Sequence, residues 1–286
     1  MIYRRRVSPL HAVRAGVAVS YCLALALAAL LASNPLELAA VTAAILGAGV
    51  AARVGRALRT ALIVAIPMGI AIALVNALLT RDGLTVIARL GDLPLLGHTD
   101  VTLEATAYGG VLALRAVALI LCGALYTAAV DPDEVLRLVR RVSFHSALTA
   151  TVATRLVPVL VRDSRRLIDA QRCRPGAPPS RWTLARAVTA GALDRALDVA
   201  AALEVRGYGA ARRPPRSSRA WSRHDHAFLV SATVVASVAV AARAAGLSPF
   251  HAYPSLSAPV DPSVLIESSV LIAAALLPFA NRRGIA

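Results

Sequence analysis

Six apolar stretches, each about as long as a transmembrane helix, constrain this chain of 286 residues more than any other feature. A helix needs about 20 apolar residues to cross the hydrocarbon core of a bilayer. The stretches run approximately from Val13 to Ala32, Leu36 to Ala52, Ala57 to Leu79, Ala105 to Val130, Ala227 to Ala245 and Val264 to Phe279. The whole sequence is 57% hydrophobic and 16% charged, whereas a soluble domain is roughly 45–50% apolar and about 25% charged. The fold class that we predict is an all-α integral membrane protein with about six transmembrane helices.

Local sequence features refine the first three of these spans. The dipeptide Asn34-Pro35 predicts a short turn, so the first two spans are candidates for a tight helical hairpin. Pro67 lies inside the third span, where neighbouring helices can satisfy the freed backbone groups, and a kink is expected. Three arginines precede the first span as in a signal peptide, but no small-residue cleavage site follows, and we expect a retained helix.

The distribution of arginine predicts the orientation of the spans. All 31 basic residues are arginines and the net charge is +15. The N-terminal arm, the second and fourth connections and the C-terminal tail carry 27 of them, and the opposite side carries 3. Positively charged loops remain on the cytoplasmic side. Both termini are therefore expected in the cytoplasm.

This topology divides the chain into three parts. Residues 1–130 are expected to form four transmembrane helices, residues 131–226 a cytoplasmic helical segment, and residues 227–286 two further transmembrane helices. The segment 131–226 begins with Asp131-Pro132, a typical helix start. Its second helix is expected from Ser146 to Gln171 and its third from Leu184 to Arg206.

Two of the predicted cytoplasmic helices end in an arginine beside a helix-breaking residue. Arg174 precedes Pro175-Gly176, and Arg206 precedes Gly207, a typical C-terminal capping glycine. In the third helix, Leu193, Leu197, Ala200 and Leu203 recur at helical spacing and predict one apolar face. A terminal arginine can compensate the helix dipole. Alternatively, the two guanidinium groups could pair with carboxylates in acidic pockets of a partner.

At these residues the chain resembles a known family, the transmembrane T components of energy-coupling factor (ECF) transporters, which are cobalt-permease-like proteins. The sequence ALEVRGYG, from Ala202 to Gly209, is similar to the second arginine signature of that family, and DAQRCRPG, from Asp169 to Gly176, stands in the place of the first. Val205 replaces a small residue of the pattern, and Pro175 replaces a glycine. Arg172 is therefore a second candidate for the first arginine role.

The resemblance implies a non-catalytic subunit that couples two ABC ATPase subunits to a substrate-binding S subunit of a vitamin or transition-metal importer. It also implies a location in the cytoplasmic (inner) membrane of a bacterium. Arg174 and Arg206, with Arg172 and Gly207 beside them, would dock onto the ATPases. ATP and magnesium would bind to those partners, so no cofactor or metal is expected in this chain. The substrate itself is not readable from the sequence.

Two other classes of function are weighed against this one. A conventional permease would form its own substrate pathway from polar groups that converge within the spans, but Arg115 is nearly the only ionisable residue in their interior. A membrane scaffold would have no ATPase partner. No phosphate-binding glycine loop or HExxH motif occurs, and without interleaved aromatic residues a nucleic-acid partner is not expected.

The remaining polar residues of the spans and their ends have structural interpretations. Arg115 would make an interhelical ion pair or a carbonyl contact, or else would contact the cytoplasmic helices or a partner. Glu104 and Glu267 lie near span ends and are expected to be solvated. His224 and His226 flank Asp225 without further ligands in reach, which favours interfacial polar residues over a metal site.

Overall fold

The computed structural model describes residues 6–80, 85–93, 97–139, 144–173, 180–207, 220–246, 250 and 261–280. Its elements in chain order are α1 (Pro9–Ala12), α2 (Ala15–Leu31), α3 (Pro35–Ala51), α4 (Gly55–Leu79), β1 (Val86–Leu93), β2 (Gly97–Thr102), α5 (Leu103–Ala129), α6 (Pro132–Val139), α7 (Phe144–Arg172), α8 (Arg181–Val205), α9 (Arg223–Ala245), α10 (Pro262–Leu276) and the short 3₁₀ helix η1 (Leu277–Phe279). The all-α class is confirmed, because helices form nearly all of these elements.

Six apolar helices correspond to the six predicted spans. The helices α4, α5, α9 and α10 with η1 are long and apolar enough to cross a membrane, and α2 and α3 are shorter apolar helices of 17 residues. Helix α4 continues without interruption through Pro67. The connection between α4 and α5 contains an antiparallel hairpin, β1–β2, that was not predicted from the sequence, and in it Val86 pairs with Thr102.

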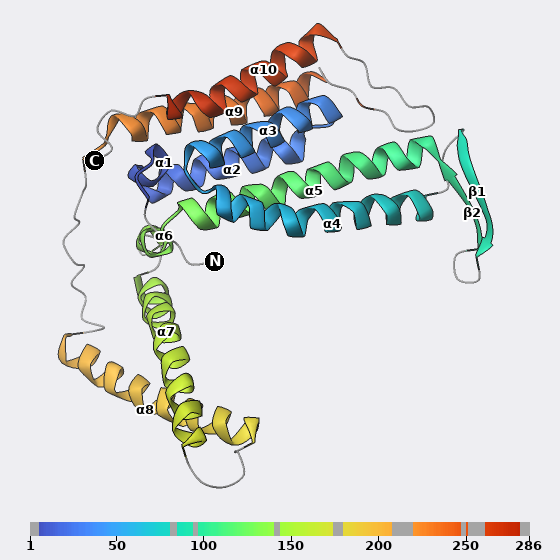
Figure 1. Cartoon of the computed structure of the whole chain (residues 1–286). Helices are drawn as coiled ribbons and strands as arrows, with labels where there is room; N and C mark the ends of the chain where they lie inside the picture. The colour runs from blue at the N-terminus through green and yellow to red at the C-terminus, as the bar shows by residue number, and fades with distance from the viewer. Residues whose placement is uncertain are drawn as a thin grey trace. The chain divides into compact units, whose positions relative to one another are not determined.

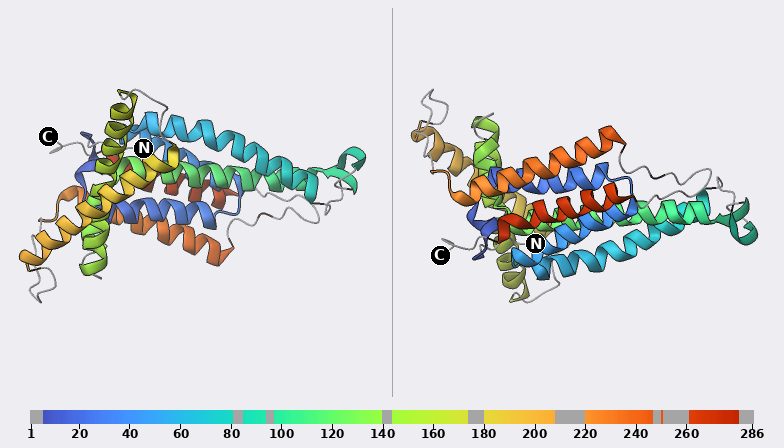
Figure 2. Two further views of the ribbon diagram at one scale, coloured as in Figure 1. Left: turned by 90° about the horizontal axis from the view of Figure 1, so that it is seen from below. Right: turned by 90° about the horizontal axis from the view of Figure 1, so that it is seen from above.

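The chain divides into two compact units. The first contains residues 1–135 and 221–286, and the second contains Leu136–Ala220 with α7 and α8. Within the first unit, α4 packs chiefly against α5, and the two lie side by side (Figures 1 and 2). Helix α2 packs mainly against α9 and α5, and α3 mainly against α10 and α5. The expected tight hairpin between the first two spans is therefore wrong as a packing arrangement, although only three residues connect α2 to α3.

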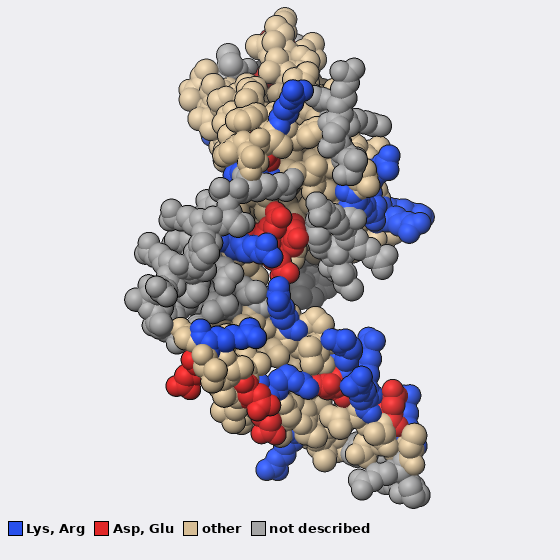
Figure 3. Space-filling view, turned by 90° about the vertical axis from the view of Figure 1, so that its left-hand side faces the viewer, with Lys and Arg blue, Asp and Glu red and all other residues tan. Residues whose placement is uncertain are grey.

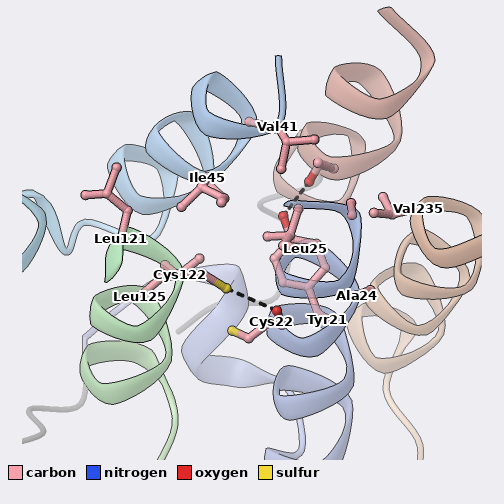
Figure 4. Packing of buried hydrophobic residues seen from close by; sticks show 14 of the residues in the cluster. Tyr21, Cys22, Ala24, Leu25, Val41, Ile45, Leu121, Cys122, Leu125 and Val235 are labelled. Carbon is pink, nitrogen blue, oxygen red and sulfur yellow. Dashed lines mark hydrogen bonds between the residues drawn. The ribbon is translucent and has the colours of Figure 1, made fainter. Parts of the chain in front are cut away.

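The core of the first unit lies where α2, α3, α5, α9 and α10 meet (Figure 4). Tyr21 is fully buried, and its hydroxyl donates to the Ala275 carbonyl oxygen at 2.8 Å. The thiol of Cys122 contacts the carbonyl oxygen of Cys22 at 3.1 Å, a contact between α5 and α2. Alanine fills much of the remaining core, which lets helices approach closely where lipid provides no hydrophobic drive between them.

Candidate functional site

The end of α8 presents Arg206 in a defined backbone geometry. Ser180 caps the start of this helix, because its hydroxyl accepts the Thr183 N–H at 3.2 Å. At the other end Arg206 is the C-cap residue, and Gly207 has φ +77°, a left-handed conformation that glycine adopts without steric cost. The Gly207 N–H donates to the Glu204 carbonyl oxygen at 2.9 Å, which closes the last turn.

The guanidinium group of Arg206 is exposed. Among the residues that the structure describes, it has no hydrogen-bond or ion-pair partner. The neighbouring Val205 is 91% exposed, so the end of α8 presents an apolar side chain next to an exposed cation. An exposed planar guanidinium can form two parallel hydrogen bonds with a carboxylate of another protein.

The end of α7 carries the other arginine candidates. Arg172 is the last residue of the helix, and its guanidinium lies 3.8 Å from the carboxylate of Asp169 one turn earlier. Both side chains are more than 70% exposed, so this ion pair contributes little to stability. Arg174 and Pro175 lie outside the described residues.

Helices α7 and α8 hold each other in place through one ion pair and an apolar contact. The Arg195 guanidinium donates to Asp163 Oδ2 at 2.6 Å, a charge-assisted bond between the two helices. Further along, the helices enclose an apolar hollow of about 300 Å³. It is lined by Thr149, Val152, Ala153 and Leu156 of α7 and by Ala196, Val199, Ala200 and Leu203 of α8.

This pairing corrects the apolar face that the sequence predicted for α8. Ala200 and Leu203 do line the hollow, but Leu193 and Leu197 are 62% and 63% exposed. The stripe that meets α7 is shifted around the helix to Ala196 and Val199. Periodicity predicted an apolar face but not which part of it meets a neighbour.

The structure places Arg206 and Arg172 at opposite ends of the contact between the two helices. The hollow is lined by the first half of α7 and the last half of α8. Asp163, which lies later in α7, pairs with Arg195, the residue just before the first lining residue of α8. Arg206 therefore lies beyond one end of this contact and Arg172 beyond the other. Such an arrangement suits two separate acidic sites better than one shared site.

Arg115, the polar residue predicted within a span, contacts the end of another membrane helix. Its Nη2 donates to the carbonyl oxygen of Ala32 at 2.7 Å, at the C-cap of α2. The last carbonyl groups of a helix lack partners within the helix and carry partial negative charge, so a guanidinium there is stabilising. This is the interhelical carbonyl contact, the first of the two roles considered for Arg115.

Two acidic residues that were expected to be solvated are buried within the protein. Glu104 is 2% exposed, and its Oε2 accepts the N–H of Thr85 at 3.3 Å. Glu267 is 6% exposed and lies next to Glu37, which is 2% exposed. The expectation of solvated charges is wrong: α3 packs against α10 around Glu267, and Glu104 is hydrogen-bonded to the backbone just before β1. Sequence position near a span end does not show these contacts.

Sequence reasoning also missed the role of Asp225. Its carboxylate caps α9 together with Ser222: the Ser222 hydroxyl accepts the Asp225 N–H at 3.1 Å, and Asp225 Oδ2 accepts the Ser222 N–H at 2.8 Å. The spacing Ser-x-x-acid before an apolar helix is the sequence signature of such a capping box. In the described part of the chain, no group of three or more His, Cys, Asp or Glu residues is placed to hold a metal ion.

The charged side chains of the two units differ in density. Figure 3 shows basic and acidic residues interspersed over α7 and α8, whereas the surface of the membrane helices is mostly uncharged. Helices α7 and α8 are thus suited to contact a charged protein surface, and the apolar helices are suited to contact lipid.

The chain is similar to a known family: the family model described as CbiQ, cobalt transport protein, matches residues 6–216. The match covers α1 to α8 and includes Arg172, Arg174, Arg206 and Gly207. No curated protein matches the chain significantly.

Proposed function

The chain belongs to the CbiQ family of cobalt transport proteins, the T-component family of ECF transporters, and from this premise we propose that it couples ATP hydrolysis by partner subunits to substrate uptake. It is a multi-pass membrane protein and a component of a transporter complex. The observation that carries the proposal is the exposed Arg206 guanidinium, which has no partner among the residues that the structure describes and follows the end of α8, where Gly207 is left-handed.

The proposed partners are two ABC ATPase subunits and a membrane-embedded S subunit that binds a vitamin or a transition-metal ion. Arg206 docks onto one ATPase, and Arg174, with Arg172 beside it, docks onto the other. ATP and magnesium bind to the ATPases, and this chain performs no catalysis. The positions of Arg206 and Arg172 beyond opposite ends of the α7–α8 contact support two separate docking points.

The proposed location is the cytoplasmic membrane of a bacterium, with both termini and the segment 131–226 in the cytoplasm. The uneven distribution of arginine between the two sides supports this orientation. The orientation also places α7 and α8 on the side where ATP is available.

Copurification tests the docking role of the arginines. In a complex expressed with its ATP-binding subunits, we expect Arg206→Glu to weaken their binding by at least about thirtyfold, because reversing one charge of a buried ion pair costs about 2–5 kcal/mol. Combining it with Arg174→Glu should abolish recovery of the ATP-binding subunits. The matched control is Arg186→Glu, a change at an exposed arginine of the same helix whose side chain has no partner among the described residues. Equal recovery of the ATP-binding subunits with R206E and R186E would contradict the docking role of Arg206.

One observation favours a second function, that of a permease with its own substrate pathway. The buried carboxyl groups of Glu37 and Glu267 lie next to each other between α3 and α10, and polar groups that converge within spans are typical of such pathways. Arg115, however, is engaged by a helix end. Substrate uptake by liposomes that contain this chain alone would favour the permease; uptake only with the ATP-binding and S subunits present supports the coupling role.

A further inference from the structure

The N-terminal end of α2 contacts the chain on both sides of the cytoplasmic unit. That unit consists of Leu136–Ala220. Glu134 lies two residues before its start, and Trp221 is the first residue after its end. Both residues, together with Asp225, contact the first two residues at the start of α2, Arg14 and Ala15. We call Arg14, Glu134, Trp221 and Asp225 the junction cluster.

On the entry side, the contact is made by a carboxylate of α6. The N–H of Ala15 donates to Glu134 Oε2 at 3.3 Å. Glu134 lies in the first turn of α6, whose start is fixed by the Asp131 side chain, which accepts the Asp133 N–H at 2.9 Å. Helix α6 continues across Val135 into the cytoplasmic unit, so Glu134 is attached to that unit by helical backbone.

On the return side, the contact is made by Asp225. Its Oδ1 accepts the N–H of Arg14 at 2.8 Å, and its Oδ2 lies 3.8 Å from Arg14 Nε. The side chain of Asp225 is 1% exposed, so its charge is only weakly screened by salt. The Arg14 guanidinium lies 4.8 Å from the centre of the Trp221 ring, a cation–π distance, and that ring lies 5.2 Å from the ring of His226.

These contacts use the electrostatics of a helix start. The first N–H groups of a helix have no partner within it, and the N-terminal end carries partial positive charge. Arg14 has no side-chain cap of its own at the start of α2. Two carboxylates from elsewhere in the sequence therefore accept the N–H groups that α2 leaves free, while Arg14 balances the charge of Asp225. The same Asp225 also caps α9, so one buried carboxylate joins the starts of α2 and α9.

From the junction cluster, rigid contacts lead into the membrane unit. The rings of Tyr21, Phe228 and Phe279 meet edge to face. The ring centres are 5.2 Å apart for Tyr21 and Phe228, 6.2 Å for Tyr21 and Phe279, and 5.0 Å for Phe228 and Phe279. The Ser231 hydroxyl donates to the Ala274 carbonyl oxygen at 2.7 Å, which joins α9 to α10. A displacement of the starts of α2 and α9 would thus move α10 with them, because packed cores deform little.

We propose that the junction cluster is the point at which movement of the cytoplasmic unit passes to the membrane helices, with Arg14, Glu134 and Asp225 as positioning residues. This inference rests on the proposed coupling function. If the two connections to the cytoplasmic unit were flexible, that unit could move without displacing the membrane helices. Because both connections are fastened to the start of one helix, movement of the unit instead displaces α2 and α9 relative to α4 and α5.

A distance measurement within the membrane unit tests this proposal. Spin labels are placed at Ile63 of α4 and Val240 of α9, which are 64% and 49% exposed, in a chain carrying Cys173→Ser. Cys22 and Cys122 are buried and remain in place. The labelled chain is assembled with its ATP-binding and S subunits in lipid nanodiscs, and the distance between the labels is compared without nucleotide and after trapping with ATP, magnesium and vanadate.

The test variant combines Glu134→Ala with Asp225→Asn, and the matched control combines Asp133→Ala with Asp261→Asn. The control residues also lie at the starts of α6 and α10, but their carboxylates have no partner among the described residues. We expect nucleotide trapping to shift the distance in the control and to lose most of that shift in the test variant, with the ATP-binding subunits still bound. An equal shift in both, or no shift in the control, overturns the proposal.

Two further results keep the inference separate from the proposed function. If the control chain fails to retain the ATP-binding subunits, the coupling function itself is contradicted. If the test variant does not assemble, Arg14→Gln replaces it, because this change keeps both backbone N–H groups of the α2 start and removes only the ion pair and the cation–π contact. R14Q should then reduce the shift, and an unreduced shift overturns the proposal.

Discussion

Single side chains in this protein satisfy helix ends that lie far from them in the sequence. Arg115 donates to the carbonyl oxygen of Ala32 at the C-cap of α2, and Asp225 accepts the N–H of Arg14 at its N-cap. Both contacts join residues that are more than 80 positions apart along the chain. Each helix end is paired within the protein, where water is scarce and an unpaired backbone group is costly.

Removing the Arg115 guanidinium should destabilise the bundle. We expect Arg115→Met to lower the free energy of unfolding by about 1.5–3 kcal/mol, since it removes a charged donor from a helix end. The cost of placing an arginine in the membrane does not offset this loss. The spans remain inserted in the unfolded reference state, so that cost is the same in the folded and unfolded protein. Thermal unfolding in detergent measures the effect.

Arg243→Met is the matched control for this change. Arg243 is an exposed arginine in the last turn of α9, without a partner among the described residues, and its replacement should change stability by less than about 0.5 kcal/mol. Equal destabilisation by the two variants would contradict the contact with Ala32.

Helix pairs in the membrane unit depend on small residues. A Cβ atom added to Gly109 of α5 would lie 2.9 Å from the Ala73 carbonyl oxygen and 3.1 Å from Asn76 Cβ, both in α4. Helix α4 packs chiefly against α5, so this close approach largely determines its position.

Gly109→Ala should therefore separate α4 from α5 and destabilise the protein by about 1–3 kcal/mol, the usual cost of overpacking. The control is Gly110→Ala, since a Cβ atom there meets nothing within 4 Å, and it should be neutral or gain up to about 1 kcal/mol of helix propensity. Thermal unfolding of both variants decides between packing and propensity: if G110A is as destabilising as G109A, the close approach of α4 is not the cause.

Helix positions were predictable from the sequence, but their neighbours were not. Apolar length predicted six spans, and Asp131-Pro132 and Gly207 predicted the start of α6 and the end of α8, because these are local effects. The exposure of Leu193, the burial of Glu267 and the contact between Arg14 and Asp225 depend on which helices meet. No local pattern encodes that choice.

At the scale of the whole molecule, the apolar helices and the arginine-rich helices form separate units with different surfaces. The membrane unit is held by a core rich in alanine and by paired helix ends. The second unit presents arginines at the ends of α7 and α8. We infer that partner subunits move the second unit and that the junction cluster passes this movement to the first.

The most direct measurement of the central claim uses the chain's own Cys173, an exposed residue between Arg172 and Arg174. A maleimide photo-crosslinker is attached to it before the ATP-binding subunits are added, while the buried Cys22 and Cys122 do not react. After illumination of the assembled complex, mass spectrometry should find Cys173 joined to an ATP-binding subunit, and Cys173→Ser should abolish the product. An intact complex in which labelled Cys173 forms no product with an ATP-binding subunit would contradict the account.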